Sequence, residues 1–353
     1  MAVNLNKEIS KIAAYLGDQS QKQMGIPGNP LWTRDFLLEV AKGNIPGHSV
    51  VHKFGRNPNI PNAVGTFETI WNGGGVYTGH NAVAAEILEV FSSSGNDIGT
   101  LVSSGTATGG STTTMEDTGA TFSSDGVAAG DVLINDTQSD HGIIVSVTET
   151  IITVWRFEGS TAIAVNDAYR VATKASTGTP VIKLRHLLNS SYVDVGGEYI
   201  ITNGVTGVDT VGAYLRMSRA RCHGGDNVGE ITCRQKTTTA NIMMALPIGY
   251  NSTMICADTI PAGKTGHFIT WFGSLSGKVN ANCSLRLKVR PVGDVFQVQE
   301  EASVMSSGNS ALPRVYPIPK GGFKEMNDIT IEADSDTNST GIAAGWAMLY
   351  VDN

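Results

Sequence analysis

The residue patterns that could carry chemistry are few, and each lacks a part that its chemistry requires. His48 and His52 are four residues apart, a spacing that places two imidazoles on one face of a helix, where they can bind a metal ion. Gly47 and the nearby prolines disfavour a helix here, so the spacing does not predict a metal site. The cysteines include no Cys-x-x-Cys pair, which leaves a structural zinc site without support. Their state is open between free thiols and disulfides, and they are Cys222, Cys233, Cys256 and Cys283.

Two loop patterns are also incomplete. Gly263-Lys264-Thr265 matches the end of a phosphate-binding loop, but Asp258 stands where that motif requires glycine, so a hairpin turn is the better interpretation. Asp334, Asp336 and Asn338 alternate like the first ligands of a calcium loop. The glycine and the glutamate that complete such a loop are not at their positions, and a polar loop between strands is expected instead.

The sequence contains no motif for nucleophilic or metal-assisted catalysis. His-Glu-x-x-His and Gly-x-Ser-x-Gly are both missing. Asp328 and Glu332 are expected to be ordinary charges on the solvent face of a strand. We therefore predict no catalytic residue, no cofactor, no metal and no enzymatic activity.

The composition limits the classes of partner. Only 16% of the 353 residues are charged, against roughly 25% in an average globular protein. The net charge is −7 and Lys and Arg form no run, which argues against nucleic acid, because that partner requires clustered cations. No segment approaches the ~20 apolar residues of a membrane span, and the N-terminus lacks the apolar core of a signal peptide. We expect a protein made in the cytoplasm, with no nucleic-acid or membrane partner.

Residues 1–44 are expected to form a short helical hairpin. Apolar residues recur at spacings of three and four within residues 5–22, the pattern of an amphipathic helix. Asn29-Pro30 provides a cap and a first-turn proline for a second helix, which Gly43 would end. Two short helices bury little surface, so the hairpin either packs on its own β domain or serves as an anchor in a larger assembly.

The rest of the chain is predicted to be mainly β. Strict alternation in residues 285–290 indicates a strand with one buried and one solvent face. Residues 343–351 are apolar on both faces, as in a central or interface strand. The 41 glycines and abundant Ser and Thr agree with many turns. We expect residues 178–353 to form a jelly-roll-like β-sandwich body, which could be divided into two β subdomains.

A separate small β domain is predicted for residues 100–177. Short runs rich in β-branched residues follow a Ser/Thr/Gly-rich segment there, as in a small sandwich or barrel. Gly99-Thr100 and Gly178-Thr179-Pro180 flank the unit and are typical of domain boundaries. We interpret it as an insertion into a β body that begins within residues 45–99.

Residues 47–77 fit neither the helical nor the β pattern. They combine cations, histidines, aromatic residues and a triple glycine, a mixture that favours ordering by contacts with another domain or chain. We interpret residues 45–99 as a connector followed by the start of the β body. The candidate connector and assembly residues are His52, Lys53, Phe54, Arg56, Phe67 and Trp71.

The same segment begins a resemblance to a known family. Residues 51–60 with 68–71, then residues 92–97, then residues 259–266 followed by the strand 285–290 resemble blocks that occur in this order in a family of tailed-bacteriophage virion structural proteins. Residues 100–177 are absent from the usual pattern of that family. They are similar to the Ser/Thr/Gly-rich β modules of phage particle proteins.

The resemblance implies a head-decoration, neck or fibre-like component of the virion, without catalytic residues. Such a protein would attach to capsid, neck or tail proteins through its N-terminal region and project its β domains outward. We also expect a homotrimer, and removal of residues 1–77 would leave soluble β domains that no longer enter particles. The candidates for the oligomer interface, or else for ordinary sandwich core, are Trp271, Phe272 and Trp346.

An alternative function keeps the particle location. The chain would be a receptor- or glycan-binding module that contacts a host surface glycan through the insertion or the C-terminal rim. Trp155 and Tyr169 are the candidate glycan contacts, provided that their rings are exposed.

Overall fold

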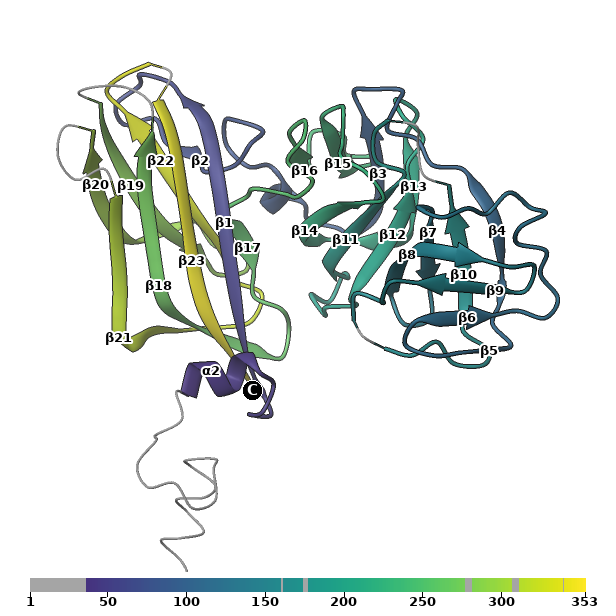
Figure 1. Cartoon of the computed structure of the whole chain (residues 1–353). Helices are drawn as coiled ribbons and strands as arrows, with labels where there is room; N and C mark the ends of the chain where they lie inside the picture. The colour runs from purple at the N-terminus through teal and green to yellow at the C-terminus, as the bar shows by residue number, and fades with distance from the viewer. Residues whose placement is uncertain (1–35, 160, 174–176, 277–280, 307–310, 339) are drawn as a thin grey trace, which may run out of the picture.

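The structure is a computed structural model that describes residues 36–159, 161–173, 177–276, 281–306, 311–338 and 340–353. It has two lobes side by side, and most of its regular elements are strands in antiparallel sheets (Figure 1). The mainly β class is therefore confirmed. None of the described helices is long and apolar enough to span a membrane.

The predicted N-terminal hairpin falls largely outside the described residues. The first expected helix, 5–22, and the beginning of the second are not among them. The described part contains α2 (Phe36–Ala41). Gly43 follows it with a φ of +76° and donates its N–H to the carbonyl oxygen of Val40, so this glycine ends the helix as the sequence predicts.

The first lobe is a sandwich of two antiparallel sheets. One has the strand order β1-β23-β18-β21, and the other has the order β17-β22-β19-β20, with β2 paired to β22. Apolar side chains of both sheets fill the space between them, among them Phe268, Trp271, Trp346, Leu285 and Ile331. The strands are β1 (His48–Ile60), β2 (Glu68–Thr69), β17 (Ala257–Thr259), β18 (Lys264–Ser276), β19 (Asn282–Arg290), β20 (Gln297–Met305), β21 (Ala311–Phe323), β22 (Asp328–Ser335) and β23 (Thr340–Asp352).

Two strand predictions are confirmed in this lobe. Buried residues alternate with partly exposed ones along β19, as the pattern of residues 285–290 indicates. β23 lies between β1 and β18 and is buried on both faces along most of its length. Its doubly apolar sequence is therefore that of a central strand.

The expectation that the unusual segment is not a strand is wrong for residues 48–60. These residues form β1, an edge strand antiparallel to β23. The sequence pattern did not predict this strand because three of its buried positions are not apolar: Lys53, Gly55 and Asn57 are buried between exposed or partly exposed neighbours. Gly55 is needed for close packing, since a Cβ atom there would lie 2.2 Å from the carbonyl oxygen of Ile70.

Two sheets of the second lobe share one core. Their strand orders are β13-β3-β15-β16 and β12-β11-β14, and the core between them includes Leu88, Leu184, Ile231 and Met244. The strands are β3 (Glu86–Ser92), β11 (Val181–Leu188), β12 (Gly197–Ile201), β13 (Val208–Tyr214), β14 (Arg216–His223), β15 (Ile231–Gln235) and β16 (Ile242–Leu246).

The third sheet of this lobe comes from the residues predicted as an insertion. Its order is β4-β10-β7-β8-β9-β6-β5, and it has its own core with Met115, Phe122 and Phe157 fully buried. A smaller apolar cluster that includes Val132 and Tyr199 packs this unit on the neighbouring sheet. The strands are β4 (Leu101–Thr106), β5 (Gly109–Gly110), β6 (Thr114–Glu116), β7 (Val132–Asn135), β8 (Asp140–Val147), β9 (Ile151–Val154) and β10 (Ala168–Ala172).

The chain builds the two lobes by nested insertion. It starts the sandwich with β1 and β2, leaves through the 3₁₀ helix η1 (Gly79–Asn81), forms the second lobe from β3 to β16, and returns at β17. The unit from β4 to β10 is in turn inserted between β3 and β11. Residues 178–353, expected as a β body that could be divided into two subdomains, are divided, because β11–β16 and β17–β23 contribute to different cores.

The inner insertion starts and ends at a buried carboxylate. Asp97 is fully buried, and its oxygens accept hydrogen bonds from the hydroxyl of Ser92 (2.6 Å) and from the backbone N–H groups of Thr179 (3.0 Å), Val228 (3.0 Å) and Gly229 (2.8 Å). These bonds satisfy the charge without a cation. They also bring the two ends of the inserted unit together, which explains how it interrupts the lobe without disturbing its sheets.

Candidate functional site

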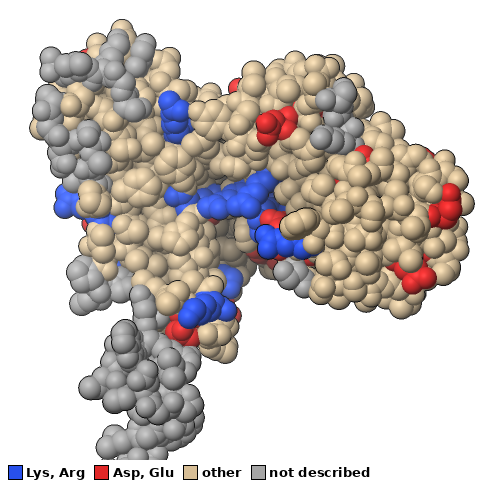
Figure 2. Space-filling view, in the orientation of Figure 1, with Lys and Arg blue, Asp and Glu red and all other residues tan. Residues whose placement is uncertain are grey.

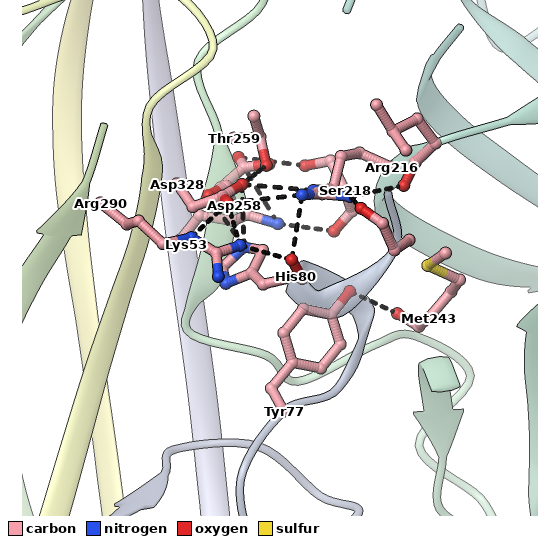
Figure 3. Close-up of polar contacts among 12 residues, drawn as sticks. Lys53, Tyr77, His80, Arg216, Ser218, Met243, Asp258, Thr259, Arg290 and Asp328 are labelled. Atoms are coloured by element: carbon pink, nitrogen blue, oxygen red, sulfur yellow. Dashed lines mark hydrogen bonds and ion pairs between the residues drawn. The ribbon is translucent and has the colours of Figure 1, made fainter. Parts of the chain in front are cut away.

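The two lobes meet at a cluster of buried and partly buried ionisable side chains, which we call the ionic junction. It consists of Lys53, Asp258, Arg290 and Asp328 from the sandwich and His80 and Arg216 from the second lobe and its entry segment. Figure 3 shows that these side chains point toward one another from four strands of the sandwich, from β14 and from η1, which are far apart in the sequence.

Lys53 connects β1 to the second lobe. Its side chain is 1% exposed, and its Nζ donates a hydrogen bond of 2.6 Å to the carbonyl oxygen of Ser218 on β14. Asp258 lies 3.6 Å from the same nitrogen and accepts a hydrogen bond from the Ser218 hydroxyl. Burial lowers the pKa of Lys53, and the nearby Asp258 opposes that shift.

Asp328 is the centre of the junction. Its oxygens accept hydrogen bonds from Thr259 (2.5 Å), from Arg290 (2.5 and 3.1 Å) and from Arg216 (3.2 Å). Burial opposes ionisation of this carboxyl group, but the charge of His80 in its protonated form, the charge of Arg216 and the hydrogen bonds from Arg216 and Thr259 outweigh burial and lower its pKa to about 2. Asp328 therefore carries its charge in the interior at neutral pH.

Arg216 joins the lobes with more than one bond. Besides its contact with Asp328, its guanidinium donates to the carbonyl oxygens of Ala82 (2.8 Å) and His80 (3.0 Å). These two carbonyl groups belong to the segment that leads from the sandwich into the second lobe. Arg216 thus ties β14, the entry segment and β22 to one another.

His80 packs against this ion cluster as a neutral side chain. Its ring lies edge-on to Tyr77 at 5.0 Å, and its Nε2 is 3.2 Å from the carbonyl oxygen of Asp258. Burial lowers its pKa to about 4, although Asp328 is 3.7 Å away and favours the charged form. At pH 7 the two arginines therefore balance the Asp328 charge without help from His80.

Three of the predicted connector residues contact the second lobe. Lys53 does so through Ser218, Arg56 donates a 2.8 Å hydrogen bond to the hydroxyl of Tyr250, and Trp71 packs in a small core with Ala245.

The other three connector candidates lie on the sandwich surface or under it. Phe54 stacks on Phe272 with ring centroids 6.3 Å apart, Phe67 lies beneath the guanidinium of Arg286, and His52 is exposed. The six candidates are thus not one cluster: three of them contact the second lobe, and only Lys53 belongs to the ionic junction.

The candidate interface tryptophans are core residues of a single chain. Trp271 is 0% exposed and Trp346 is 2% exposed, and the two are cross-strand partners inside the sandwich. The structure therefore corrects the interface assignment for both and supports the core interpretation, because neither ring can reach a second chain. Phe272 is partly exposed beside Phe54 and keeps its place as a candidate.

Most residues of the ionic junction were not predicted from the sequence. Asp328 and Glu332 are buried, so their assignment to a solvent face is wrong. The only local signal is that β22 has apolar residues between its charges, as a strand buried on both faces requires, and every residue of it is buried. Arg216 and His80 gave no signal, because their partners are more than a hundred residues away.

The other sequence patterns resolve into structural roles. His48 and His52 lie in a strand, where four residues span about 13 Å, too far for one metal ion. The predicted polar loop holds for Asp336 and Asn338, which follow β22, but not for Asp334, which lies buried in β22 and accepts backbone hydrogen bonds from Gly65 and Ser284. Gly263 lies in the turn between β17 and β18, which belong to opposite sheets, and Lys264 and Thr265 begin β18, so this is a turn between sheets and not a hairpin. The four cysteines are free thiols.

One further cluster has the residue types of a metal site. His141 and Glu158 of the inserted unit and His223 of β14 offer ligand atoms within 4.8 Å of one another. Glu158, however, already lies 3.3 Å from Lys183 and 3.7 Å from Arg221. A divalent cation would have to displace these charges and would be repelled by them, so we assign no metal here.

The comparisons with known proteins assign no family. No family model and no curated protein matches the chain. Among solved structures, the crystal structure of the infectious bursal disease virus VP2 subviral particle has a TM-score of 0.17 at 7% identity, over 94% of this chain and 77% of that chain. The structure of the infectious bursal disease virus Gx strain has a TM-score of 0.19 at 8% identity, over 87% and 73%. Similarity this low indicates neither a shared fold nor a function.

Replacing Asp328 with asparagine should destabilise the protein strongly. The change leaves Arg216, whose side chain is 5% exposed, without its counter-charge, and breaking one partner of a buried ion pair costs about 3–5 kcal/mol. Urea denaturation would measure the loss. Asp209→Asn, which removes the acid of an exposed ion pair with Lys236, is the matched control and should barely move the midpoint. Equal effects of the two substitutions would contradict the junction.

Stability should fall as the pH drops from about 6.5 to about 4, in part because of His80. The unfolded histidine has a pKa of about 6.5, while the folded one titrates at about 4. Between these values only the unfolded chain takes up the proton, which favours unfolding. His80→Gln should make the decline shallower, whereas the exposed His52→Gln should not. Urea midpoints at pH 7 and pH 5 would test this. An equal drop of the midpoint between the two pH values in the wild type and in His80→Gln would refute it.

Proposed function

We propose that this chain is a structural component of a tailed-phage virion. It attaches to capsid, neck or tail proteins through its N-terminal region and projects its β lobes outward, after synthesis in the host cytoplasm. The observation that carries the proposal is the ionic junction. Relative motion is the default between domains, and a buried network in which Asp328 needs both Arg216 and Arg290 holds the lobes at one angle.

The matching sequence blocks support the proposal. Residues 51–60 supply Lys53, residues 92–97 supply Asp97, and residues 259–266 supply Thr259, which donates to Asp328. The blocks that resemble virion proteins therefore coincide with the points where the sandwich, the second lobe and the inserted unit are joined.

The attachment end is the end of the sandwich that carries α2 and the C-terminus (Figure 1). Phe36 and Leu38 of α2 are about half exposed there, and the predicted helical anchor leads into this end. Self-association as a trimer would bury well over ~2,000 Å² in an obligate assembly. The stacked pair of Phe54 and Phe272 is the candidate for part of that surface.

Deletion of residues 1–44 tests the proposal. The truncated chain retains β1 and Lys53 and should keep a thermal transition close to that of the full chain, yet be missing from purified particles. Deletion of 1–77, in contrast, removes β1 and leaves Asp258 without Lys53, so it should damage the sandwich itself. Mass spectrometry of particles would detect the protein. Incorporation of the 1–44 deletion at the full-length level would refute attachment through this region.

A second candidate function, glycan binding, has one observation in its favour. Trp155 is 80% exposed just after β9 in the inserted unit, and an exposed indole ring offers a flat apolar face for a sugar. Tyr169, the other candidate, is buried and donates its hydroxyl hydrogen bond to Asp117, so it is removed from this role.

Trp155→Ala should reduce adsorption to host cells without changing the melting temperature, because the ring contributes little to the core. Trp155→Phe, which keeps a flat ring, is the control and should retain most of the adsorption. Unchanged adsorption of Trp155→Ala would remove the inserted unit from this role.

A further inference from the structure

The sheet β12-β11-β14 carries two adjacent pairs of like charges. Lys183 is the cross-strand partner of Arg221, and Arg185 is the partner of Arg219. All four lie on the same face, since the residues between them, such as Leu184 and Ala220, belong to the core on the other side. Like charges directly opposite each other destabilise a sheet. An anion bound to these four residues, which we call the cationic ladder, would reduce their repulsion.

One end of the ladder has its anion from within the chain. Glu158 of the inserted unit lies 3.3 Å from Lys183, 3.6 Å from Arg185 and 3.7 Å from Arg221. The cations also lower the pKa of Glu158, although its burial acts in the opposite direction. A carboxylate is thus the kind of group that this face holds.

The other end of the ladder opens into a cleft between the lobes. The cleft has a volume of about 420 Å³, with Arg185, Arg219 and Arg221 on one wall and residues 49–52 of β1 on the other. Figure 2 shows Lys and Arg side chains gathered in the groove between the lobes, in a chain whose net charge is −7.

The acidic side chains of the cleft are already paired. Asp194 contacts His186 at 2.8 Å, and Asp258 lies beside Lys53. The cleft's other cations are paired too, since Arg216 binds Asp328 and Lys264 binds Asp352. Arg219 differs, because no acid of the described residues lies within 4.0 Å of it, and the charge of Asp258 acts on it only from farther away.

A second group in the cleft lacks a partner. Tyr350 lines the cleft and is 4% exposed, and its hydroxyl group makes no hydrogen bond to any described residue. A buried hydroxyl without a partner is costly. An oxyanion in the cleft would give this donor an acceptor and Arg219 a counter-charge.

We propose that the cleft binds a ligand through a phosphate or carboxylate group held by Arg219 and Arg185. Arginine suits such groups because its guanidinium can donate two parallel hydrogen bonds to them. The volume lies in the range of small-molecule sites and accommodates a free small anion or an acidic sugar. An extended polyanion such as a nucleic acid would need a longer tract of cations. The ligand class is therefore a small oxyanion, free or as part of a sugar.

The test uses the purified full-length chain, so its result is separate from particle incorporation. Inorganic phosphate, pyrophosphate and glucuronate are titrated by calorimetry and by thermal shift, with glucose and sodium chloride of equal ionic strength as controls. At least one anion should bind and raise the melting temperature beyond the chloride control. Binding of glucuronate identifies the acidic-sugar source, and binding of the phosphates alone identifies free phosphate.

Arg219→Gln provides the decisive variant. It should weaken anion binding at least tenfold, while the ligand-free protein melts no lower than the wild type, because the substitution removes a like-charge contact. Arg156→Gln, an exposed arginine of the inserted unit, should bind as the wild type does. The proposal is overturned if no anion raises the melting temperature more than the chloride control does, or if Arg219→Gln binds the anion as tightly as the wild type. It is also overturned if ligand-free Arg219→Gln melts at a lower temperature than the wild type, because Arg219 would then have a structural role.

Discussion

The buried carboxylate of Asp328, held between Arg216 and Arg290, is the interaction on which the arrangement of the lobes depends. An ionised group in the interior is tolerated only if every partner is in place. Its partners come from β14, β17 and β19, so they are together only when the second lobe has docked on a completed sandwich. An apolar interface would tolerate small rotations, whereas this one favours a single orientation.

The nested topology makes that orientation matter. The second lobe is inserted between β2 and β17. The first sheet of the sandwich is therefore complete only when β1, from before the insertion, pairs with β23, from after it. Lys53 then extends from β1 to Ser218. The cleft that faces the cationic ladder exists only between correctly placed lobes, since it is lined by β1 of the sandwich and by β11 and β14 of the second lobe. The ligand site and the junction therefore depend on the same docking.

The sequence predicts local features of this fold better than distant ones. The alternation in β19 and the doubly apolar sequence of β23 each reflect the burial of neighbouring residues, which one segment can reveal. β1 was missed because Lys53 and Gly55 occupy inward positions where apolar residues are expected. The buried charge of Asp328 depends on Arg290, Thr259 and Arg216, which are 38, 69 and 112 residues away, and no local pattern encodes these pairings.

The most direct test of a fixed junction is a distance measurement between the lobes. Spin labels can be placed at the exposed positions Gln297 of the sandwich and Val205 of the second lobe. Pulsed electron paramagnetic resonance then measures the distribution of distances between the two labels. The account predicts one narrow distribution in the wild type that broadens in Asp328→Asn under conditions where both lobes stay folded. A broad distribution in the wild type, or a narrow one that Asp328→Asn leaves unchanged, would contradict it.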